Sequence, residues 1–295
     1  METNKELGLL MIRGSGQTGF KRQELFINRL KQKLEKAGFE TEVLAYEVVD
    51  WYGPIQEQQE LILERMKKAR IRIRSKRFRR LIISNIGDLI NYGGKPGFPY
   101  YGYEETHKLV HKTILKLKNQ LNEQAPLLII AASMGTEIIN DYIRDRQTAA
   151  SEGKDDPLGK SAFERLETLT GLFTLGNNLP IFAASQHIDE IHPIDFPPPK
   201  LSPELQKIAV WENYYDKNDA MGYPIKPLNR YFREHASLMD IQINTGGPLL
   251  SWNFFSHFGY WRSRKLVRRL AAHIGKLLIQ VRKVPISENE SRFKS

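Results

Sequence analysis

Residues 126–136 have the sequence Pro-Leu-Leu-Ile-Ile-Ala-Ala-Ser-Met-Gly-Thr, an uninterrupted apolar run that leads into a serine flanked by small residues. Apolar residues without alternation are typical of a parallel strand covered on both faces, so we expect a buried strand at 127–132. A helix is expected to begin at about Gly135. Ser133 therefore lies in the turn from strand to helix, and the small residues Ala131 and Gly135 allow that turn to be sharp.

Strands and helices alternate on both sides of this stretch. Apolar and β-branched runs predict further strands at 7–13, 41–49, 81–88, 171–177, 207–215 and 238–246. Apolar residues at helical spacing predict covering helices with stripes at Leu25, Leu30 and Leu34, at Ile62, Met66, Ala69 and Ile73, at Val110, Ile114, Leu117 and Leu121, and at Leu266, Leu270, Ile274, Leu277 and Val281. This alternation predicts an α/β fold with a mostly parallel central sheet and helices on both faces.

The sequence shows no internal repeat and no linker, which favours one domain over residues 1–295. A proline-rich segment at about 183–206 is longer than a structural connection needs, and we expect it to form a lid or a pocket wall. A polar tail is expected at about 286–295.

Composition excludes several classes of protein. Hydrophobic residues make up 41% and charged residues 26% of the 295 residues, as in globular proteins, which excludes a disordered or fibrous chain. The longest apolar run, 127–132, is far shorter than the ~20 residues that a membrane-spanning helix needs. The amino terminus lacks the long apolar core of a secretory signal, so we expect a cytoplasmic protein.

Cysteine is absent, which excludes disulfides, thiolate metal sites and a cysteine nucleophile. His107 and His111 have the spacing of metal ligands on a helix, but the glutamate that should follow the first histidine is replaced by Lys108. We therefore predict no metal site.

The positive charge is concentrated in one run, residues 67–80, Lys-Lys-Ala-Arg-Ile-Arg-Ile-Arg-Ser-Lys-Arg-Phe-Arg-Arg. The run contains nine basic residues and no acidic residue, so it contributes nine of the ten net positive charges of the chain. Such a run can be a solvated helix end, or it can attract the phosphates of an anionic lipid surface or of nucleic acid. Phe78 is its only aromatic residue, which argues against stacking on single-stranded nucleic acid and makes nucleic acid the least favoured alternative.

Ser133 could act as a nucleophile if a histidine removed its proton and a carboxylate oriented that histidine. Asp216 and Asp219 follow the strand predicted at 207–215, and His257 lies between the last predicted strand and the last predicted helix. A serine between small residues is a frequent pattern by itself. Its place between the most apolar strand and a helix, with an aspartate and a histidine later in the chain, favours catalysis.

Several stretches resemble the α/β-hydrolase superfamily, on the branch of intracellular lipases and phospholipase-like esterases. These are LLMIRGSG at 9–16, LLIIAASMGTEI at 127–138, LFTLGNNLPIF at 172–182, WENYYDKNDAMGYPIKPL at 211–228 and SHFGYW at 256–261. The resemblance covers about residues 8–280 and implies an α/β-hydrolase fold that cleaves carboxylic esters through an acyl-enzyme, without a cofactor. It implies Ser133 as nucleophile, His257 as base and Asp219 as acid, with Asp216 as the alternative acid.

The resemblance also implies an oxyanion hole made of two backbone amides, which by position are those of Ser15 and Met134. Two positions depart from the family pattern. Ala132 replaces the histidine that commonly precedes the nucleophile, and Arg13 replaces the histidine before the oxyanion-loop glycine. The second departure affects the residue that usually holds this loop in place.

Two other functions remain open. Residues 14–19, Gly-Ser-Gly-Gln-Thr-Gly, match the phosphate-binding turn of dinucleotide-binding proteins, although Glu47 and Asp50 come later than the acidic residue of that motif should. A nucleotide-binding protein would leave Ser133 and His257 without a role. The third possibility is a catalytically inactive hydrolase-fold module that only binds a partner.

Overall fold

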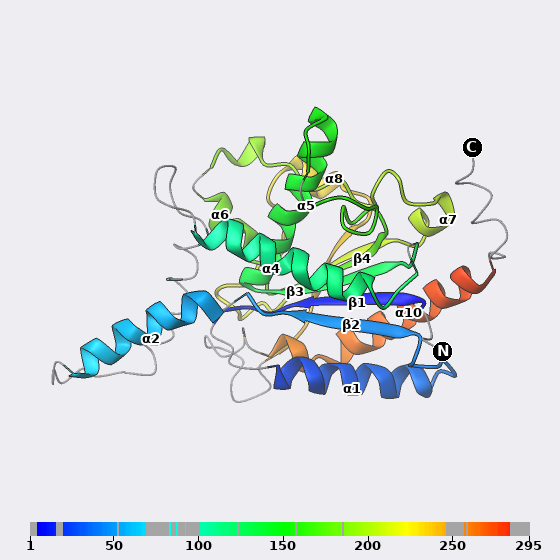
Figure 1. Cartoon of the computed structure of the whole chain (residues 1–295), viewed down its shortest axis with the longest axis horizontal. Coiled ribbons are helices and arrows are strands. Elements are labelled where there is room, and N and C mark those ends of the chain that lie inside the picture. Colours follow the sequence, from blue (N-terminus) through cyan, green and yellow to red (C-terminus); the bar gives the residue numbers. More distant parts are fainter. Residues whose placement is uncertain are drawn as a thin grey trace.

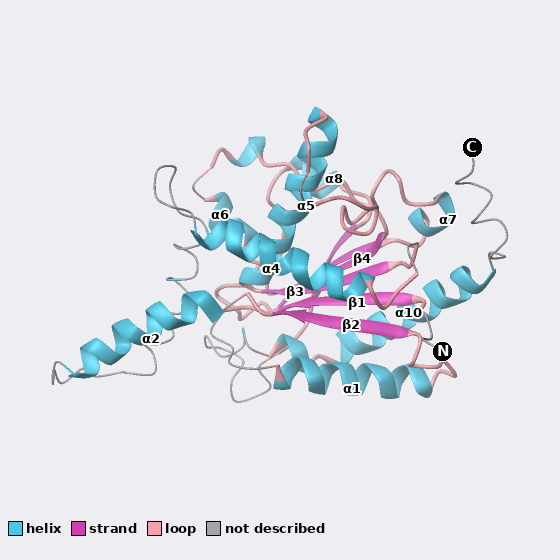
Figure 2. Cartoon of the chain, in the orientation of Figure 1, coloured by secondary structure: helices cyan, strands magenta, loops and turns pink. Residues whose placement is uncertain are grey.

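The computed structural model describes residues 5–15, 20–51, 53–68, 83, 87, 92, 101–122, 124–156, 158–184, 186–245, 257 and 259–283. Within these ranges six strands form one parallel sheet (Figure 2): β1 (Leu7–Ile12), β2 (Leu44–Val49), β3 (Leu127–Ala132), β4 (Leu169–Leu175), β5 (Val210–Tyr215) and β6 (Leu238–Gln242). Their order across the sheet is β2-β1-β3-β4-β5-β6. The predicted α/β class is confirmed, and the apolar run at 127–132 is an interior strand.

Helices cover both faces of the sheet (Figure 1). On one face α1 (Lys21–Glu35) packs beside α10 (Arg264–Lys283), and on the other lie α4 (Tyr101–Lys118) and α5 (Met134–Glu152). The shorter elements are α6 (Leu179–Ala183), α7 (Pro203–Gln206), α8 (Arg230–Glu234) and the 3₁₀ turns η1 (Ile188–Glu190) and η3 (Tyr260–Arg262). Helix α2 (Gly53–Lys68) extends away from the sheet. In the described ranges no helix has the length and apolar character needed to cross a membrane.

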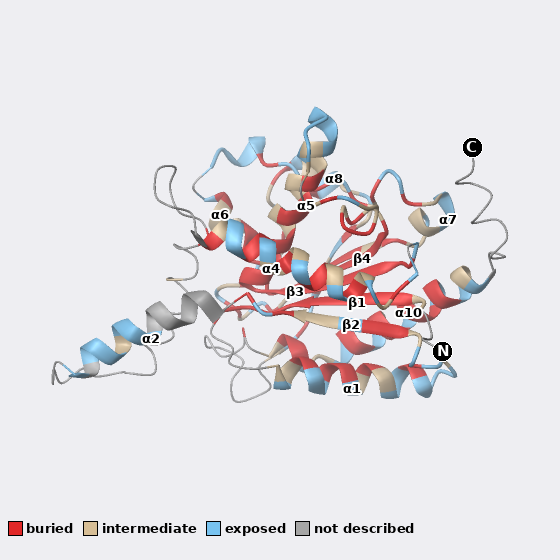
Figure 3. Cartoon of the chain, viewed as in Figure 1, coloured by how far each residue is buried: buried red, intermediate tan, exposed pale blue. Residues whose placement is uncertain are grey.

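The sheet divides the core into two layers, because successive residues of a strand point to opposite faces. Leu9 and Met11 of β1 belong to the layer under α1 and α10, whereas Leu10 and Ile12 belong to the layer under α4 and α5. All four side chains are fully buried. The buried strands in Figure 3 therefore have no solvent-facing side near the centre of the sheet.

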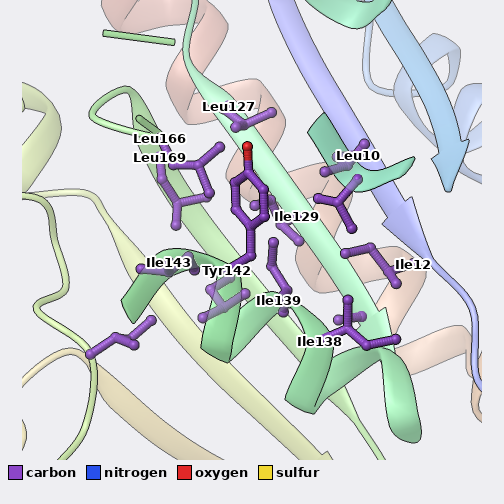
Figure 4. Packing of buried hydrophobic residues seen from close by; sticks show 14 of the residues in the cluster. Leu10, Ile12, Leu127, Ile129, Ile138, Ile139, Tyr142, Ile143, Leu166 and Leu169 are labelled. Atoms are coloured by element: carbon purple, nitrogen blue, oxygen red, sulfur yellow. The ribbon is translucent and has the colours of Figure 1, made fainter. Parts of the chain in front are cut away.

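The α5 layer is packed around Tyr142. Figure 4 shows its ring lying against β3 among Leu127, Ile129, Leu166 and Leu169. This packing fixes α5 on the sheet, and α5 begins directly after Ser133. The position of that serine is thus set by the core.

The predicted stripes of the covering helices are largely confirmed. The buried members are Leu30, Leu34, Val110, Ile114, Leu117, Leu121, Leu266, Leu270, Ile274 and Leu277. Leu25 was expected in the core but is 52% exposed, because the neighbouring Phe26 and Ile27 are the α1 residues that turn toward the sheet. On α2, Ile62 and Met66 are 46% and 41% exposed, since that helix leaves the body of the protein.

The strand predicted at 81–88 is wrong where it can be checked: Ile83 and Gly87 are helical. The apolar run there is short, and periodicity alone does not separate a short strand from a helix. The basic run 67–80 beyond Lys68, and the tail at 286–295, lie outside the described residues.

The proline-rich segment at about 183–206 packs against the body of the protein. Ile191, Ile194 and Phe196 are buried in the α5 layer of the core. Gln147 on α5 exchanges two hydrogen bonds with the backbone of Asp195, at 2.8 and 3.0 Å. These contacts join the segment to α5 along its length.

Candidate active site

The turn after β3 holds Ser133 in an unusual backbone conformation, with φ 52° and ψ −128°. Its N–H donates to the carbonyl of Leu175 on β4, at 2.8 Å. Glycines allow the close approach: a Cβ on Gly135 would lie 2.9 Å from the carbonyl oxygens of Ile12 and Arg13, and one on Gly14 would lie 2.6 Å from the Ser133 Cβ. Because a non-glycine residue at positive φ is strained, the surrounding packing must hold this turn.

Three of the predicted residues form a continuous hydrogen-bonded chain. Ser133 Oγ lies 2.6 Å from Nε2 of His257, and Nδ1 of the same ring lies 2.8 Å from Oδ2 of Asp219. All three residues are buried. An ionised Asp219 accepts the Nδ1 proton, which leaves Nε2 as the acceptor for the serine hydroxyl.

Asp219 is surrounded by donors. Tyr260 donates its hydroxyl to Oδ2 at 2.8 Å, and the N–H of Met221 donates to Oδ1 at 2.9 Å. Burial by itself would raise the pKa of Asp219, but the hydrogen bond and charge of His257, with these two donors, outweigh it and lower the pKa below its usual value. Asp219 is therefore ionised over the neutral pH range.

Asp216, the alternative acid, lies in a different environment. Its Oδ2 accepts from the N–H and the hydroxyl of Thr245 at 2.6 and 2.8 Å, and its Oδ1 accepts from the N–H of Asn218 at 3.0 Å. These bonds tie the loop after β5 to the end of β6. The structure thus places Asp219 against His257 and gives Asp216 the bonding pattern of a loop brace.

Tyr260 is a site residue that sequence reasoning did not single out, although it lies in the quoted SHFGYW stretch. Its hydroxyl accepts from the N–H of Asp216 at 2.9 Å while donating to Asp219, so it joins the two aspartates. Burial and the nearby Asp219 carboxylate raise the pKa of Tyr260, which keeps the hydroxyl protonated. A Cβ on Gly176 would lie 2.7 Å from the Tyr260 ring, and one on Gly222 would lie 2.3 Å from Asp219 Oδ2.

The two residues predicted to supply oxyanion amides follow the neighbouring strands β1 and β3. Ser15 is buried and follows Gly14, which packs on Ser133. Met134 is the first residue of α5, where backbone N–H groups lack partners within the helix and the helix dipole is positive. The strand order changes direction between β1 and β3, which is the place where open α/β sheets bind ligands.

Arg13 takes the place of the histidine that the resemblance would predict before the oxyanion loop. Its guanidinium pairs with Asp50 after β2 and lies 5.1 Å from the centre of the Phe20 ring. Its carbonyl accepts from the indole N–H of Trp51 at 2.8 Å. This arginine therefore anchors the loop to the end of β2, and it engages Asp50, one of the carboxylates considered for a nucleotide ribose.

His107 and His111 are both occupied by structural contacts. His107 Nε2 lies 3.0 Å from the Tyr92 hydroxyl and its Nδ1 lies 3.2 Å from Asp145 Oδ2, whereas His111 Nδ1 lies 3.3 Å from the hydroxyl of Tyr142. Across the described ranges, no group of three or more His, Asp or Glu side chains is arranged to hold a metal ion. The pair is thus part of the packing between α4 and α5.

Comparisons of the chain with protein-family models, with curated proteins and with solved structures found no match.

Proposed function

We propose that the protein is a serine hydrolase of the α/β-hydrolase type that cleaves carboxylic esters. The chain of hydrogen bonds from Ser133 through His257 to Asp219 carries the proposal, because it joins a hydroxyl, a base and an ionised acid in the order that acyl transfer needs. The chain joins residues that lie 124 positions apart in the sequence.

The strand order supports the same assignment. In this proposal the nucleophile follows β3, the acid follows β5 and the base follows β6, so all three come from the carboxyl-end edge of one parallel sheet. The resemblance of the LLIIAASMGTEI and WENYYDKNDAMGYPIKPL stretches points to the same residues.

In the proposed reaction His257 Nε2 takes the proton of Ser133 as the hydroxyl oxygen attacks the ester carbonyl. Asp219 holds the ring in the required tautomer and stabilises the imidazolium. The amides of Ser15 and Met134 hold the oxyanion. The imidazolium then protonates the leaving alcohol, and water activated by the same ring releases the acid from Ser133.

The segment at about 183–206 serves in this proposal as a fixed pocket wall. The segment buries Ile194 and Phe196 and forms hydrogen bonds to α5. These contacts favour a fixed wall rather than a lid that swings open.

A cytoplasmic enzyme that docks reversibly on an anionic leaflet completes the proposal. Helix α2 extends from the body (Figure 1) and exposes Leu61, Ile62 and Met66 by 39%, 46% and 41%, and the basic run 67–80 begins at its end. An apolar helix face followed by Lys and Arg suits a lipid surface better than it suits nucleic acid.

Labelling with a fluorophosphonate probe tests the catalytic proposal. We expect covalent labelling of the wild type and none of Ser133→Ala, with Ser263→Ala as the matched control that still labels. Equal labelling of Ser133→Ala and wild type would reject this nucleophile. Absence of labelling in the wild type, together with binding of a dinucleotide or a protein, would favour one of the two non-catalytic alternatives.

A series of nitrophenyl esters tests the substrate class. We expect hydrolysis of esters with apolar acyl chains, and hydrolysis of amides alone would contradict an esterase.

Sedimentation with vesicles of phosphatidylserine and phosphatidylcholine tests the docking. We expect binding in dilute buffer that disappears in molar salt, because the Debye length falls from ~10 Å at 0.1 M to ~3 Å at 1 M. Changing Arg72, Arg74, Arg77 and Arg80 to Gln should abolish binding and spare hydrolysis of a short soluble ester. Unchanged sedimentation of that variant would remove the membrane part of the proposal.

A further inference from the structure

A second concentration of positive charge lies in the described part of the chain, away from the run 67–80. Helix α10 contains seven Lys and Arg and no Asp or Glu. Where it packs beside α1, the two helices border a groove of about 530 Å³. The groove is lined by Arg29, Gln32, Lys33, Lys36, Arg264, Lys265, Val267 and Arg268. Six of these eight residues are cationic, and no carboxylate is among them.

The cations face the groove from both walls. Lys33 lies in the last turn of α1 and Lys36 is the C-cap residue of that helix, three positions further. Arg264 and Arg268 are four positions apart on α10 and share one face of it. All four side chains are exposed, and within the described residues none has a carboxylate at salt-bridge distance. Buried Val267 lies at the bottom between them.

Other cations of α10 are paired with carboxylates, and the groove cations have no such partners in the described part of the chain. Arg269 pairs with Glu212, and Arg282 pairs with Glu6 at 3.1 Å. Both lie outside the lining of the groove. Glu212 and Glu6 therefore neutralise cations outside the groove, and the described residues place no carboxylate at salt-bridge distance from Lys33, Lys36, Arg264 or Arg268.

Arg29, which lines the groove, lies close to other positive charges. Its guanidinium donates to the carbonyls of Trp261, Arg262 and Leu25, so it is fixed in place without a carboxylate. Burial and then the charge of Arg262 lower the pKa of Arg29 and of the neighbouring Arg22. Fixed cations that repel one another create a positive potential, which an anion of matching shape relieves.

A second hollow of about 520 Å³ continues the groove toward the site. It shares Arg264 and Lys265 with the first and adds polar groups from Asn244, Thr245 and Ser263. Thr245 is the residue that binds Asp216. The basic groove and the acid loop are therefore connected along one surface.

We propose that the groove between α1 and α10 is a binding site for a compact soluble anion that carries several phosphate groups. Guanidinium groups such as those of Arg264 and Arg268 bind phosphate oxygens in pairs, and lysines add charge from the opposite wall. A groove of this volume is within the ~300–1,000 Å³ of small-ligand sites. A flat bilayer would contact the rims and leave the space between the walls empty, so a small anion fits better.

Titration calorimetry with inorganic tripolyphosphate at 0.1 M salt tests the proposal. We expect saturable binding at least tenfold tighter than that of orthophosphate, because a chain of phosphates can reach both walls. Changing Lys33, Lys36, Arg264 and Arg268 to Gln should weaken tripolyphosphate binding on the order of 100-fold. Replacing only the two arginines by Lys keeps the charge and should give an intermediate loss, because a lysine cannot bind in the paired geometry.

A control variant separates the site from general attraction. Changing the exposed Lys112, Lys116, Lys154 and Lys207 to Gln removes the same number of charges and should leave tripolyphosphate binding within about twofold. Equal weakening by both quadruple variants, or no binding by the wild type, would overturn the proposal. Thermal unfolding of each variant establishes that it is folded before binding is compared.

The lipid alternative is decided with the same proteins. Sedimentation of the groove variant with phosphatidylserine vesicles should equal that of the wild type, because the groove binds a small anion. Loss of vesicle binding together with unchanged tripolyphosphate affinity would assign the groove to a bilayer and overturn the proposal.

Discussion

Two buried carboxylates near Ser133 have opposite environments. Asp219, in the loop after β5, accepts hydrogen bonds from His257, Tyr260 and the N–H of Met221, and its pKa is lowered. Glu137, one turn after Ser133 on α5, has an Oε2 that is buried and has no hydrogen-bond partner. Burial and then the charge of Asp141 raise the pKa of Glu137 well above its usual value.

The difference teaches that burial does not by itself decide the charge of an acid. Both carboxylates lose solvent, which favours the neutral form in each case. Around Asp219 the loop directs donors onto both oxygens, and these outweigh the loss of water. Around Glu137 the charge of Asp141, one turn further along α5, adds to the effect of burial, and burial also raises the pKa of Asp141 itself. The chain thus lowers the pKa of one carboxyl and raises the pKa of another in the same region.

The largest expected effect is on catalysis through Asp219. Asp219→Asn keeps the shape of the side chain but removes the charge that orients His257 and stabilises its imidazolium. We expect kcat for a nitrophenyl ester to fall on the order of 10⁴-fold, with little change in the folded structure. Steady-state kinetics and circular dichroism measure the two quantities.

Asp216→Asn is the matched control, because Asp216 lies three residues away and is also buried. Its carboxylate braces Thr245 and Asn218 and does not contact His257, so we expect at most about a tenfold loss of kcat and a lower melting temperature. A larger loss of kcat in Asp216→Asn than in Asp219→Asn would show that the acid is misassigned.

Much of the fold could be predicted because the central strands β1, β3 and β4 are buried on both faces. The run at 127–132 and the strand β4 carry strong apolar signals, and the alternation with helices indicates a parallel sheet. The prediction of buried residues failed where it depended on the helical repeat alone. Leu25 belongs to a helical repeat, yet the rotation of α1 on the sheet is fixed by tertiary packing that places Phe26 and Ile27 inward.

Prediction of the site from the sequence has the same limit, because contacts fixed by tertiary structure are not visible in it. The order of Ser133, Asp219 and His257 along the chain predicted their meeting, since all three follow strands or precede a helix at one edge of the sheet. The role of Tyr260 depends on a hydroxyl that reaches two aspartates from another loop, and spacing in the sequence does not reveal such a contact. The groove between α1 and α10 was missed because its cations come from helices more than 200 residues apart.

A smaller effect is expected from Tyr260→Phe. Losing one donor should raise the pKa of Asp219, since the hydroxyl helps to lower it. The titration of the Asp219 carboxyl, followed by ¹³C NMR, should therefore move to higher pH. At neutral pH we expect a loss of about tenfold in kcat/KM, the value of one hydrogen bond to a charged group.

Tyr92→Phe is the control for Tyr260→Phe. Tyr92 is also a buried tyrosine that donates to a carboxylate, Asp141, at 3.0 Å. Its loss should lower the melting temperature and leave the titration of Asp219 unchanged. A shift of the Asp219 titration in both variants would mean that the effect is one of general stability.

The smallest effect is expected from Glu137→Gln, and it concerns stability. A carboxyl whose pKa is raised in the folded state favours folding only while it is protonated, so its contribution is present below the ordinary pKa and is lost as pH rises toward the folded value. At neutral pH the neutral glutamine should therefore raise the free energy of unfolding by about 1 kcal/mol or more. Below about pH 4, where the carboxyl is protonated in both states, the variant and the wild type should unfold alike.

Denaturant unfolding at several pH values measures this difference, with Glu152→Gln as the control on the same helix. Glu152 is exposed and pairs with Lys154, so its replacement should change stability by no more than about 0.5 kcal/mol at any pH. A stabilisation of Glu137→Gln that did not depend on pH would mean that packing of the amide, and not the charge of the acid, separates the two proteins. A destabilisation at neutral pH would show that Glu137 is ionised and held by a partner, and the contrast with Asp219 would then fail.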